Sequence, residues 1–375
     1  MTTTLRAWTI RTFAGSGEPG FAGDGGSSVQ ASLNEPKGLA LDSHGHVYIA
    51  DSENHVIRKV DRVSGVITTV AGVAGDNEAR PSAQPGAEVG PPAVEDPFAD
   101  MSQSVEQKYR QQADVSGTVR YLINGAAVQK RFSGDGSLAV QAHLNFPTAV
   151  ALDQQGNLFI ADTMNHRVRL VDAATGVITT LAGTGQARFS GDGGPAAQAA
   201  LNEPAALALD GQSRLFIADQ SNHRVRVVDL KTGLISTYAG TGSAAYDGDG
   251  VPASSASLSG PSGLIVRDGV LYIADTFNGR IRAVDLSTGL ISTAIGDGGE
   301  YRFQSPADPP STSLSRPSGM VIDASGNLFV SDSDSHLIRR TAVYGPVRTV
   351  VWEGRSRKAP PYPDLQGNRP APTGR

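Results

Sequence analysis

The feature of this sequence that most constrains the fold is a unit that repeats along the chain. The prolines that open successive units, Pro147, Pro204 and Pro261, are separated by 57 residues. The glycines that close the units, from Gly15 to Gly354, keep nearly the same period. In a chain of this kind the architecture is set by how neighbouring copies pack. The chain is therefore expected to form one repeat array rather than two unrelated domains.

Each unit contains four short segments with the character of β-strands. The second is a continuous apolar run, such as Leu215–Ala218, which indicates a strand covered on both faces. The third alternates, so that Arg167 and Arg169 share one face and Val168 lies on the other. Gly-Asn, Ser-Gly and Thr-Gly turns separate the segments. Four antiparallel strands repeated about six times predict an all-β fold, a six-bladed β-propeller with one degenerate blade.

The recurring sequence resembles the NHL repeat. The motif Tyr/Phe-Ile-Ala-Asp-x-x-Asn-His-x-Val/Ile-Arg follows Pro-x-Gly/Ala and precedes Gly-x-Ile-x-Thr-x-Ala-Gly. It occurs at Tyr48–Arg58, Phe159–Arg169 and Phe216–Arg226, and in weaker form at Tyr272–Arg282 and Phe329–Arg339. The resemblance covers roughly residues 8–352 and implies a propeller. It does not select a function, because related propellers include RNA-binding modules, interaction platforms, sensor domains, hydrolases and lyases.

Two segments match the outer strand of the last blade. Trp8–Gly15 has the pattern of a last strand with no earlier strands before it, which predicts that it completes the final blade and closes the ring. Pro346–Trp352 has the same pattern. The sequence leaves open which of the two is outermost.

Residues 73–114 depart from the repeat. They are rich in Pro, Ala, Gly and Gln, and they carry eight acidic against three basic side chains. We interpret them as an irregular insert or degenerate blade, with a lid or a partner-docking segment as the alternative. Residues 1–354 are then expected to form a single propeller, and the polar, Pro-rich residues 355–375 a disordered tail.

The composition limits the classes of function. The formal net charge of −5 argues against a nucleic-acid partner. The absence of Cys excludes disulfides and thiolate metal sites. We see no signal peptide and no apolar run long enough to span a membrane, so the default expectation is a cytoplasmic monomer. No cofactor motif, such as a Walker loop, is present, and none is predicted.

Four histidines occupy the same position of the unit: His55, His166, His223 and His336. Copies of one residue lie around a ring and far apart, whereas a catalytic site needs different groups at one point. The histidines are therefore interpreted as structural, each holding the turn between the second and third strands by a hydrogen bond to the backbone. The alternative is a metal-binding ring in the central channel.

The recurrent charges also receive a structural interpretation. Each arginine pair of the third strand recurs with an aspartate that ends the second strand, which predicts ion pairs, with an RNA-binding groove as the alternative. The aspartates are Asp51, Asp162, Asp219, Asp275 and Asp332, and the pairs are Arg167/Arg169, Arg224/Arg226 and Arg280/Arg282. Between units, Phe21–Gly26, Phe132–Gly136, Phe189–Gly194 and Tyr246–Gly250 predict rigid turns with an aromatic plug, with a cation or phosphate site as the alternative.

Function is expected where equivalent positions differ. The residues around the opening proline vary between units, and chain geometry places them on the same face as the loop between the second and third strands. They are predicted to line one entrance of the channel, where propeller ligands bind. The candidates are Glu35, Lys37, Asn145, Thr148, Glu203, Ser262, Arg316 and Ser318.

The sequence favours a non-catalytic propeller that presents one channel face to a protein or small-molecule partner. The alternative is an enzyme with a polar or metal-assisted channel site, such as a lactonase-like hydrolase or a lyase, which would use a divalent cation there. RNA binding ranks third. The sequence does not indicate the partner or substrate.

Overall fold

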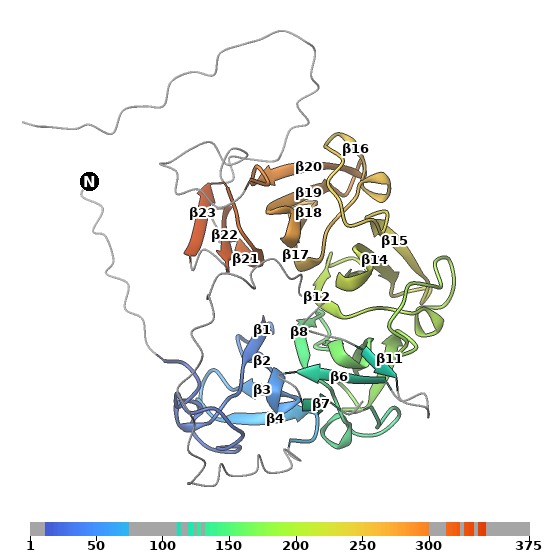
Figure 1. The fold of residues 1–375 in the computed structure, drawn as a ribbon. Helices are drawn as coiled ribbons and strands as arrows, with labels where there is room; N and C mark the ends of the chain where they lie inside the picture. The colour runs from blue at the N-terminus through green and yellow to red at the C-terminus, as the bar shows by residue number, and fades with distance from the viewer. Residues whose placement is uncertain are drawn as a thin grey trace, which may run out of the picture.

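The described residues form antiparallel sheets, and within each repeat unit the strands lie in chain order. The computed structural model describes residues 12–74, 111–113, 119–123, 126–128, 132–299, 313–322, 326–333 and 337–342. Figure 1 shows the sheets following one another around an axis, with the first strand of each sheet innermost. This arrangement is a β-propeller, as the sequence predicts.

Five sheets carry the repeat, and we call them blades 1 to 5. Blade 1 contains β1 (Pro36–Leu41), β2 (Val47–Asp51), β3 (Val56–Val60) and β4 (Ile67–Ala71). Blade 2 contains β8 (Pro147–Leu152), β9 (Leu158–Asp162), β10 (Arg167–Val171) and β11 (Ile178–Ala182). Blade 3 contains β12 (Pro204–Leu209), β13 (Arg214–Asp219), β14 (Arg224–Asp229) and β15 (Ile235–Ala239).

The last two blades differ slightly from this plan. Blade 4 contains β17 (Pro261–Arg267), β18 (Val270–Asp275), β19 (Arg280–Asp285) and β20 (Leu290–Ile295), with β16 (Val251–Pro252) paired to β20. Blade 5 contains β21 (Pro317–Ile322), β22 (Asn327–Asp332) and β23 (Leu337–Ala342). A separate three-stranded sheet contains β5 (Gln111–Ala113), β6 (Val119–Ile123) and β7 (Ala126–Val128).

Short 3₁₀ turns stand at two places in the unit. One precedes each of blades 1 to 4: η1 (Ser28–Gln30), η3 (Ala139–Gln141), η5 (Ala196–Gln198) and η7 (Ala253–Ser255). The other links the second and third strands of the same blades: η2 (Ser52–Asn54), η4 (Thr163–Asn165), η6 (Gln220–Asn222) and η8 (Thr276–Asn278). No helix among the described residues is long and apolar enough to cross a membrane.

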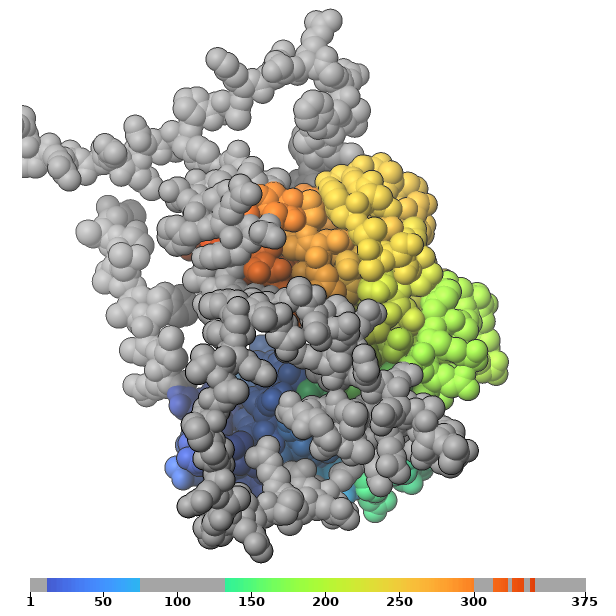
Figure 2. All heavy atoms as spheres, viewed as in Figure 1, coloured from blue at the N-terminus to red at the C-terminus, as the bar shows by residue number. Residues whose placement is uncertain are grey.

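The hydrophobic core lies between blades. Ile57 and Ala71 of blade 1 pack with Leu158 and Ile160 of blade 2, and equivalent clusters join blades 2 to 3, 3 to 4 and 4 to 5. Each blade is therefore apolar on both faces, which explains the continuous apolar runs of the second strands. Figure 2 shows the atoms of blades 3 and 4 in unbroken contact on the face that it displays.

The sequence predicts six blades, but the described residues form five sheets of the repeat, so that count is not confirmed. The spacing of the closing glycines predicts a further unit that ends at Gly125, between the units of blades 1 and 2. In the structure, however, blades 1 and 2 contact each other directly. β1 contacts β8, and the Gly72 amide donates to the Ala139 carbonyl at 2.9 Å, as Gly183 does to Ala196 at 3.0 Å. Residues 346–375, and most of the irregular segment 73–114, lie outside the described residues.

Candidate functional site

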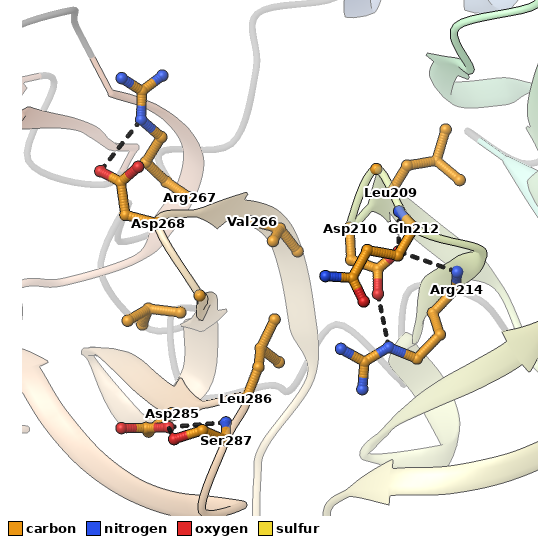
Figure 3. A pocket seen from close by; sticks show the side chains of 13 residues that line it. Leu209, Asp210, Gln212, Arg214, Val266, Arg267, Asp268, Asp285, Leu286 and Ser287 are labelled. Carbon is orange, nitrogen blue, oxygen red and sulfur yellow. Dashed lines mark hydrogen bonds and ion pairs between the residues drawn. The ribbon is translucent and has the colours of Figure 1, made fainter.

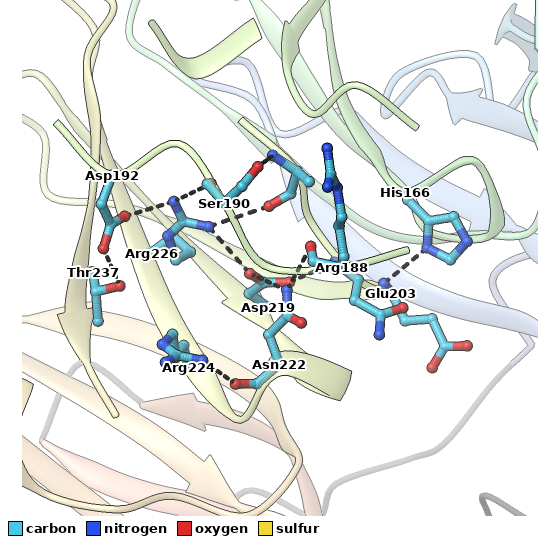
Figure 4. Close-up of polar contacts among 12 residues, drawn as sticks. His166, Arg188, Ser190, Asp192, Glu203, Asp219, Asn222, Arg224, Arg226 and Thr237 are labelled. Carbon is cyan, nitrogen blue, oxygen red and sulfur yellow. Dashed lines mark hydrogen bonds and ion pairs between the residues drawn. The ribbon is translucent and has the colours of Figure 1, made fainter. Parts of the chain in front are cut away.

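A buried arginine joins two carboxylates in each of blades 1 to 4. In blade 3, Arg226 Nη2 donates to Asp192 Oδ1 at 2.6 Å and Nη1 donates to Asp219 Oδ2 at 3.4 Å (Figure 4). Asp219 ends β13, whereas Asp192 comes from the turn that precedes the blade. Equivalent pairs of contacts are made by Arg58, Arg169 and Arg282. The ion pairs predicted for the second arginine of each pair are confirmed, and the turn aspartate is a partner in them.

The first arginine of each pair has different contacts from those predicted. Arg224 donates to the carbonyl oxygens of Asn222 at 3.0 Å and Thr241 at 2.6 Å, rather than to a carboxylate. The ring centre of Phe189 lies 3.8 Å from its Cζ and 4.8 Å from Cζ of Arg226. The aromatic residue of the turn therefore covers both guanidinium groups, which confirms the structural interpretation of these turns.

Burial controls the titration of the strand-end carboxylates. Desolvation raises the pKa of Asp162, Asp219 and Asp275 to about 6, although hydrogen bonds and the nearby arginine lower it in part. At Asp219 the opposing donors include the Asn202 amide at 2.7 Å and Asn222 Nδ2 at 2.8 Å. These acids are thus committed to the packing of the blade, and their shifted pKa values do not mark a reacting group.

The described histidines of the repeat link one blade to the next. His166 Nδ1 accepts a hydrogen bond from the Glu203 amide at 3.1 Å (Figure 4), and His223 Nδ1 accepts one from the Gly260 amide at 3.1 Å. His55 accepts in the same way from Phe146 at 3.0 Å. The histidines are structural, as predicted, but the predicted site of the bond is wrong. It crosses the junction between blades instead of holding the turn, while His336 lies outside the described residues.

The loop that precedes the first strand of a blade and the loop that joins its second and third strands meet on one face. We call this face the channel face. The Ser221 amide, after the second strand of blade 3, donates to the Asn202 carbonyl before the first strand at 3.1 Å. Lys37 Nζ lies 3.4 Å from Glu35 Oε2 and 5.2 Å from the ring centre of Phe146 in blade 2. The side chains of Glu35 and Lys37 are exposed. The structure therefore brings these two candidates together.

Most of the other candidates take part in contacts within the ring. Thr148 Oγ1 donates to the Ala205 carbonyl of blade 3 at 3.0 Å, and Glu203 Oε2 accepts from Ser221 Oγ at 2.6 Å. Asn145 is buried, and its amide donates to Asp162 Oδ1 at 2.7 Å. The side chains of Thr148 and Glu203 are engaged in these contacts, whereas the bond of Asn145 is made by its main chain, and its buried Oδ1 and Nδ2 atoms have no hydrogen-bond partner among the described residues.

The candidates of blades 4 and 5 are also engaged. Ser262 Oγ lies 2.6 Å from Thr276 Oγ1, and Ser318 Oγ lies 3.0 Å from the Oγ atoms of Ser331 and Ser333. The Arg316 amide donates to Asp332 Oδ1 at 3.0 Å, and its guanidinium lies 5.4 Å from the ring centre of Phe277. Arg316 thus repeats the pairing of Lys37 with an aromatic ring.

Two aromatic residues of the channel face were not among the candidates. Phe146 and Phe277 each lie beside a cation, and Phe277 is 47% exposed. The signal for Phe277 is present in the sequence, since the same position of the unit holds Glu53, Met164 and Ser221 in other blades. That variation identifies the second loop, and not only the proline region, as a place of specific contacts.

A hollow of about 780 Å³ lies between the strand hairpins of blades 3 and 4 (Figure 3). The hairpin of blade 4 is short, with Asp268 and Gly269 both at positive φ, where blade 3 has the longer turn of residues 210–213. Arg214 Nε pairs with Asp210 at 2.6 Å and Arg267 Nε with Asp268 at 3.3 Å. Four of the five charged side chains that line this hollow are therefore paired with one another, whereas Asp285 accepts hydrogen bonds from the amides of Ser287 and Thr288.

The described residues contain no group of three or more His, Asp or Glu side chains that could hold a metal ion. The described histidines of the repeat use Nδ1 as the acceptor of the junction bond, so that nitrogen is engaged. A ring of metal-binding histidines would have to compete with these bonds.

Comparison with known proteins agrees with the repeat. A family model for the Teneurin NHL domain matches residues 15–89, and one for the NHL repeat matches residues 144–169. SUPPRESSOR OF QUENCHING 1 of Arabidopsis thaliana is 30% identical over 319 residues, which is 80% of this chain and 29% of that protein. NHL repeat-containing protein 2 of Gallus gallus is 27% identical over 308 residues, 74% of this chain and 42% of that one. The chain thus spans less than half of either relative.

A solved structure described as an auxiliary nutrient binding protein from Bacteroides thetaiotaomicron aligns with a TM-score of 0.45 and 16% identity. The alignment covers 88% of this chain and 75% of that one. Four-stranded blades packed face to face around an axis define the class, a β-propeller. The repeat motif and the matches place the chain in the NHL-repeat β-propeller family.

Proposed function

We propose that this chain is a non-catalytic binding or scaffold propeller that presents its channel face to a protein or small-molecule partner. The observation that carries the proposal is the division of roles within the unit. The in-phase Asp, Arg and His side chains are used in buried contacts that join strands and blades. Exposed side chains that differ between units, such as Lys37 and Phe277, lie on the channel face.

The chemistry of the channel face supports a binding role. Lys37 with Phe146 and Arg316 with Phe277 combine a cation with an aromatic ring. Aromatic and arginine side chains are enriched in protein–protein interfaces, because they supply a large contact area together with directed polar groups. A partner with an acidic group beside an apolar side chain would match such a pair.

The alternative of a channel enzyme would need acids that converge on one point. Glu35 is paired with Lys37, and Glu203 accepts from Ser221, each within its own blade. This separation of the two acids favours the binding function over acid–base or metal-assisted chemistry at the channel face.

A six-bladed ring is part of the same proposal. The five described blades contact one another in chain order through their first strands, from β1 to β8, β12, β17 and β21. Figure 1 shows the arc open between β21–β23 and β1–β4. We propose that the sixth blade fills this opening.

The binding role can be tested with immobilised full-length chain. Proteins retained from a cell extract are quantified for the wild type, for the double variant Lys37→Ala/Phe277→Ala, and for Lys231→Ala as a control in an exposed turn. We expect the retained amount of a specific partner to fall at least tenfold for the double variant and to stay at the wild-type level for the control. Equal retention by all three chains would reject the channel face as the binding surface.

A further inference from the structure

The hollow between the hairpins of blades 3 and 4 lies where one hairpin is shorter than its counterparts. Four residues separate Val266 from Leu271, which pair across the blade 4 hairpin, whereas five separate the equivalent pairs of the other blades. Two of those four residues form a tight turn with positive φ. The shorter hairpin leaves room beside that of blade 3, and the resulting volume of about 780 Å³ is in the range of small-molecule pockets.

Arg214 of the blade 3 hairpin is not needed for the hydrogen bond that its counterparts make. At the same position, His46 in blade 1 and Asn157 in blade 2 accept a main-chain amide of the neighbouring turn, each at 3.0 Å. Arg214 has no acceptor atom, and the Leu230 amide donates to the Ser213 carbonyl at 2.8 Å instead. Figure 3 shows the Arg214 guanidinium extending from its own hairpin toward the hairpins of blade 4.

The neighbours of Arg214 hold its guanidinium in place. Its Nε pairs with Asp210 at 2.6 Å, and its Cζ lies 5.4 Å from the ring centre of Phe216. Burial raises the pKa of Tyr238, and a hydrogen bond to Arg214 lowers it in part. Asp210 also accepts the main-chain amides of residues 212 to 214, so its charge does not rely on the arginine alone. Most N–H donors of the fixed guanidinium therefore remain for an anion.

The rest of the lining selects the kind of anion. Leu209, Val266 and Leu286 are partly buried and supply apolar walls. Figure 3 shows the side-chain amide of Gln212 extending into the hollow beside Arg214. Three acidic and two basic side chains line the hollow, so a doubly charged phosphate would meet net repulsion there. A single carboxylate on an apolar chain matches both the arginine and the walls.

We propose that this hollow binds a small carboxylic acid with an apolar chain, its carboxylate on the Arg214 guanidinium and its chain against the apolar walls. The hollow is formed by hairpins at one end of the strands, whereas the channel face is formed by loops at the other end. It is therefore a second site, and it does not depend on the partner of the channel face. Either proposal can fail without the other.

Ligand-observed NMR and titration calorimetry of the full chain test this site. The probe is hexanoate, compared with hexylamine as a cation of the same length and with hexyl phosphate as the more highly charged anion. We expect saturable binding of hexanoate with a Kd of about 1 mM or below, weaker binding of hexyl phosphate and none of hexylamine. Arg214→Gln should weaken the binding of hexanoate by about tenfold or more. Gln212→Trp, which fills the hollow from an exposed position, should do the same.

The matched control is Arg188→Gln, because Arg188 is exposed and does not line the hollow. This variant should bind hexanoate as the wild type does, and circular dichroism and melting verify that every variant is folded. The proposal is overturned if the wild type shows no saturable binding of hexanoate, or if Arg214→Gln or Gln212→Trp keeps the wild-type affinity. Equal binding of hexylamine, tighter binding of hexyl phosphate, or an equal loss in the control also overturns it.

Discussion

The junction between blades 2 and 3 and the open junction between blades 5 and 1 are built from the same positions of the unit, but only the first is covered. At the first, Val168 is fully buried, the His166 bond to Glu203 crosses the boundary, and the core cluster is continuous. At the second, Ile338 and Leu39 are exposed. The comparison shows that each blade has an apolar face of its own, and that the burial of this face depends on the neighbouring blade.

Blade 5 also lacks part of the internal network of the other blades. In blade 3, Arg226 is fully buried and reaches two carboxylates. In blade 5 the in-phase Arg339 has a quarter of its side chain exposed and lies 3.6 Å from Asp332 through Nε. Before blade 5, Asp297 of the sequence Gly296-Asp297-Gly298 accepts a hydrogen bond from Ser313 Oγ, and among the described residues Arg339 contacts no second carboxylate. The blade at the open junction is thus held less firmly from within.

The largest expected difference is between Arg226→Met and Arg339→Met. The first leaves Asp192 and Asp219 without their cation, and loss of one partner of a buried ion pair costs about 3–5 kcal/mol. The second removes one partly exposed contact and should cost about 1 kcal/mol or less. Urea unfolding of both variants gives the two values. Equal losses of unfolding free energy would show that the ion pairs of Arg226 in blade 3 stabilise the fold no more than the single contact of Arg339 in blade 5.

A smaller effect is expected from His223→Ala. The substitution leaves the Gly260 amide without its acceptor at the junction of blades 3 and 4, and an unsatisfied buried donor costs about 1–3 kcal/mol. Blade 4 has Gly279 at the same position, so the bond is not needed at every junction. The control is His44→Ala, because His44 is exposed and lies outside the junctions. This substitution should change the free energy of unfolding by only a few tenths of a kcal/mol. A cost as small as that of the control would contradict the linking role.

The smallest effect concerns pH. Burial raises the pKa of Asp219 to about 6, above its unfolded value of about 3.9, so the folded chain holds an extra proton between these values. Its contribution to stability is therefore full below about pH 4 and is lost as the pH rises through 6. From pH 7 to pH 4, the stability of the wild type relative to Asp219→Asn should increase by about 2 kcal/mol.

Asp210 provides the matched control for this pH dependence. Burial alone would raise its pKa, but hydrogen bonds from Arg214 and neighbouring amides bring it down to about 2. Its contribution is present above pH 4 and falls only below it, so Asp210→Asn should leave the dependence between pH 7 and pH 4 unchanged. A wild-type curve parallel to that of Asp219→Asn would show that the buried carboxylate does not take up a proton.

Much of the fold follows from the sequence because the repeat fixes local structure. The apolar run Leu215–Ala218 and the alternation in Arg224–Val228 identify strands with known faces, and the observed β13 and β14 agree with them. The number of blades does not follow in the same way. A closing glycine such as Gly125 indicates a strand-like segment before it. It does not indicate against which blade that segment packs.

The candidate site stays a prediction, and the contacts of its residues did not follow from the sequence. Variation around the opening proline selected Glu35 and Lys37 as candidates, and the structure adds that the two are paired. The role of His166 was assigned to its own turn, because its partner Glu203 lies 37 residues away in the next blade. Contacts of this kind depend on how blades stack, which a pattern within one unit does not contain.

The central claim is the proposed sixth blade, which would cover the junction between blades 5 and 1 that no described blade covers. The direct measurement is the cost of Ile338→Ala in the full chain, set against Ile281→Ala in the covered junction between blades 4 and 5. The account predicts about 2–4 kcal/mol for each, the range for a buried isoleucine. A cost of a few tenths at Ile338, with the full cost at Ile281, would show that this face is open to solvent and contradict the claim.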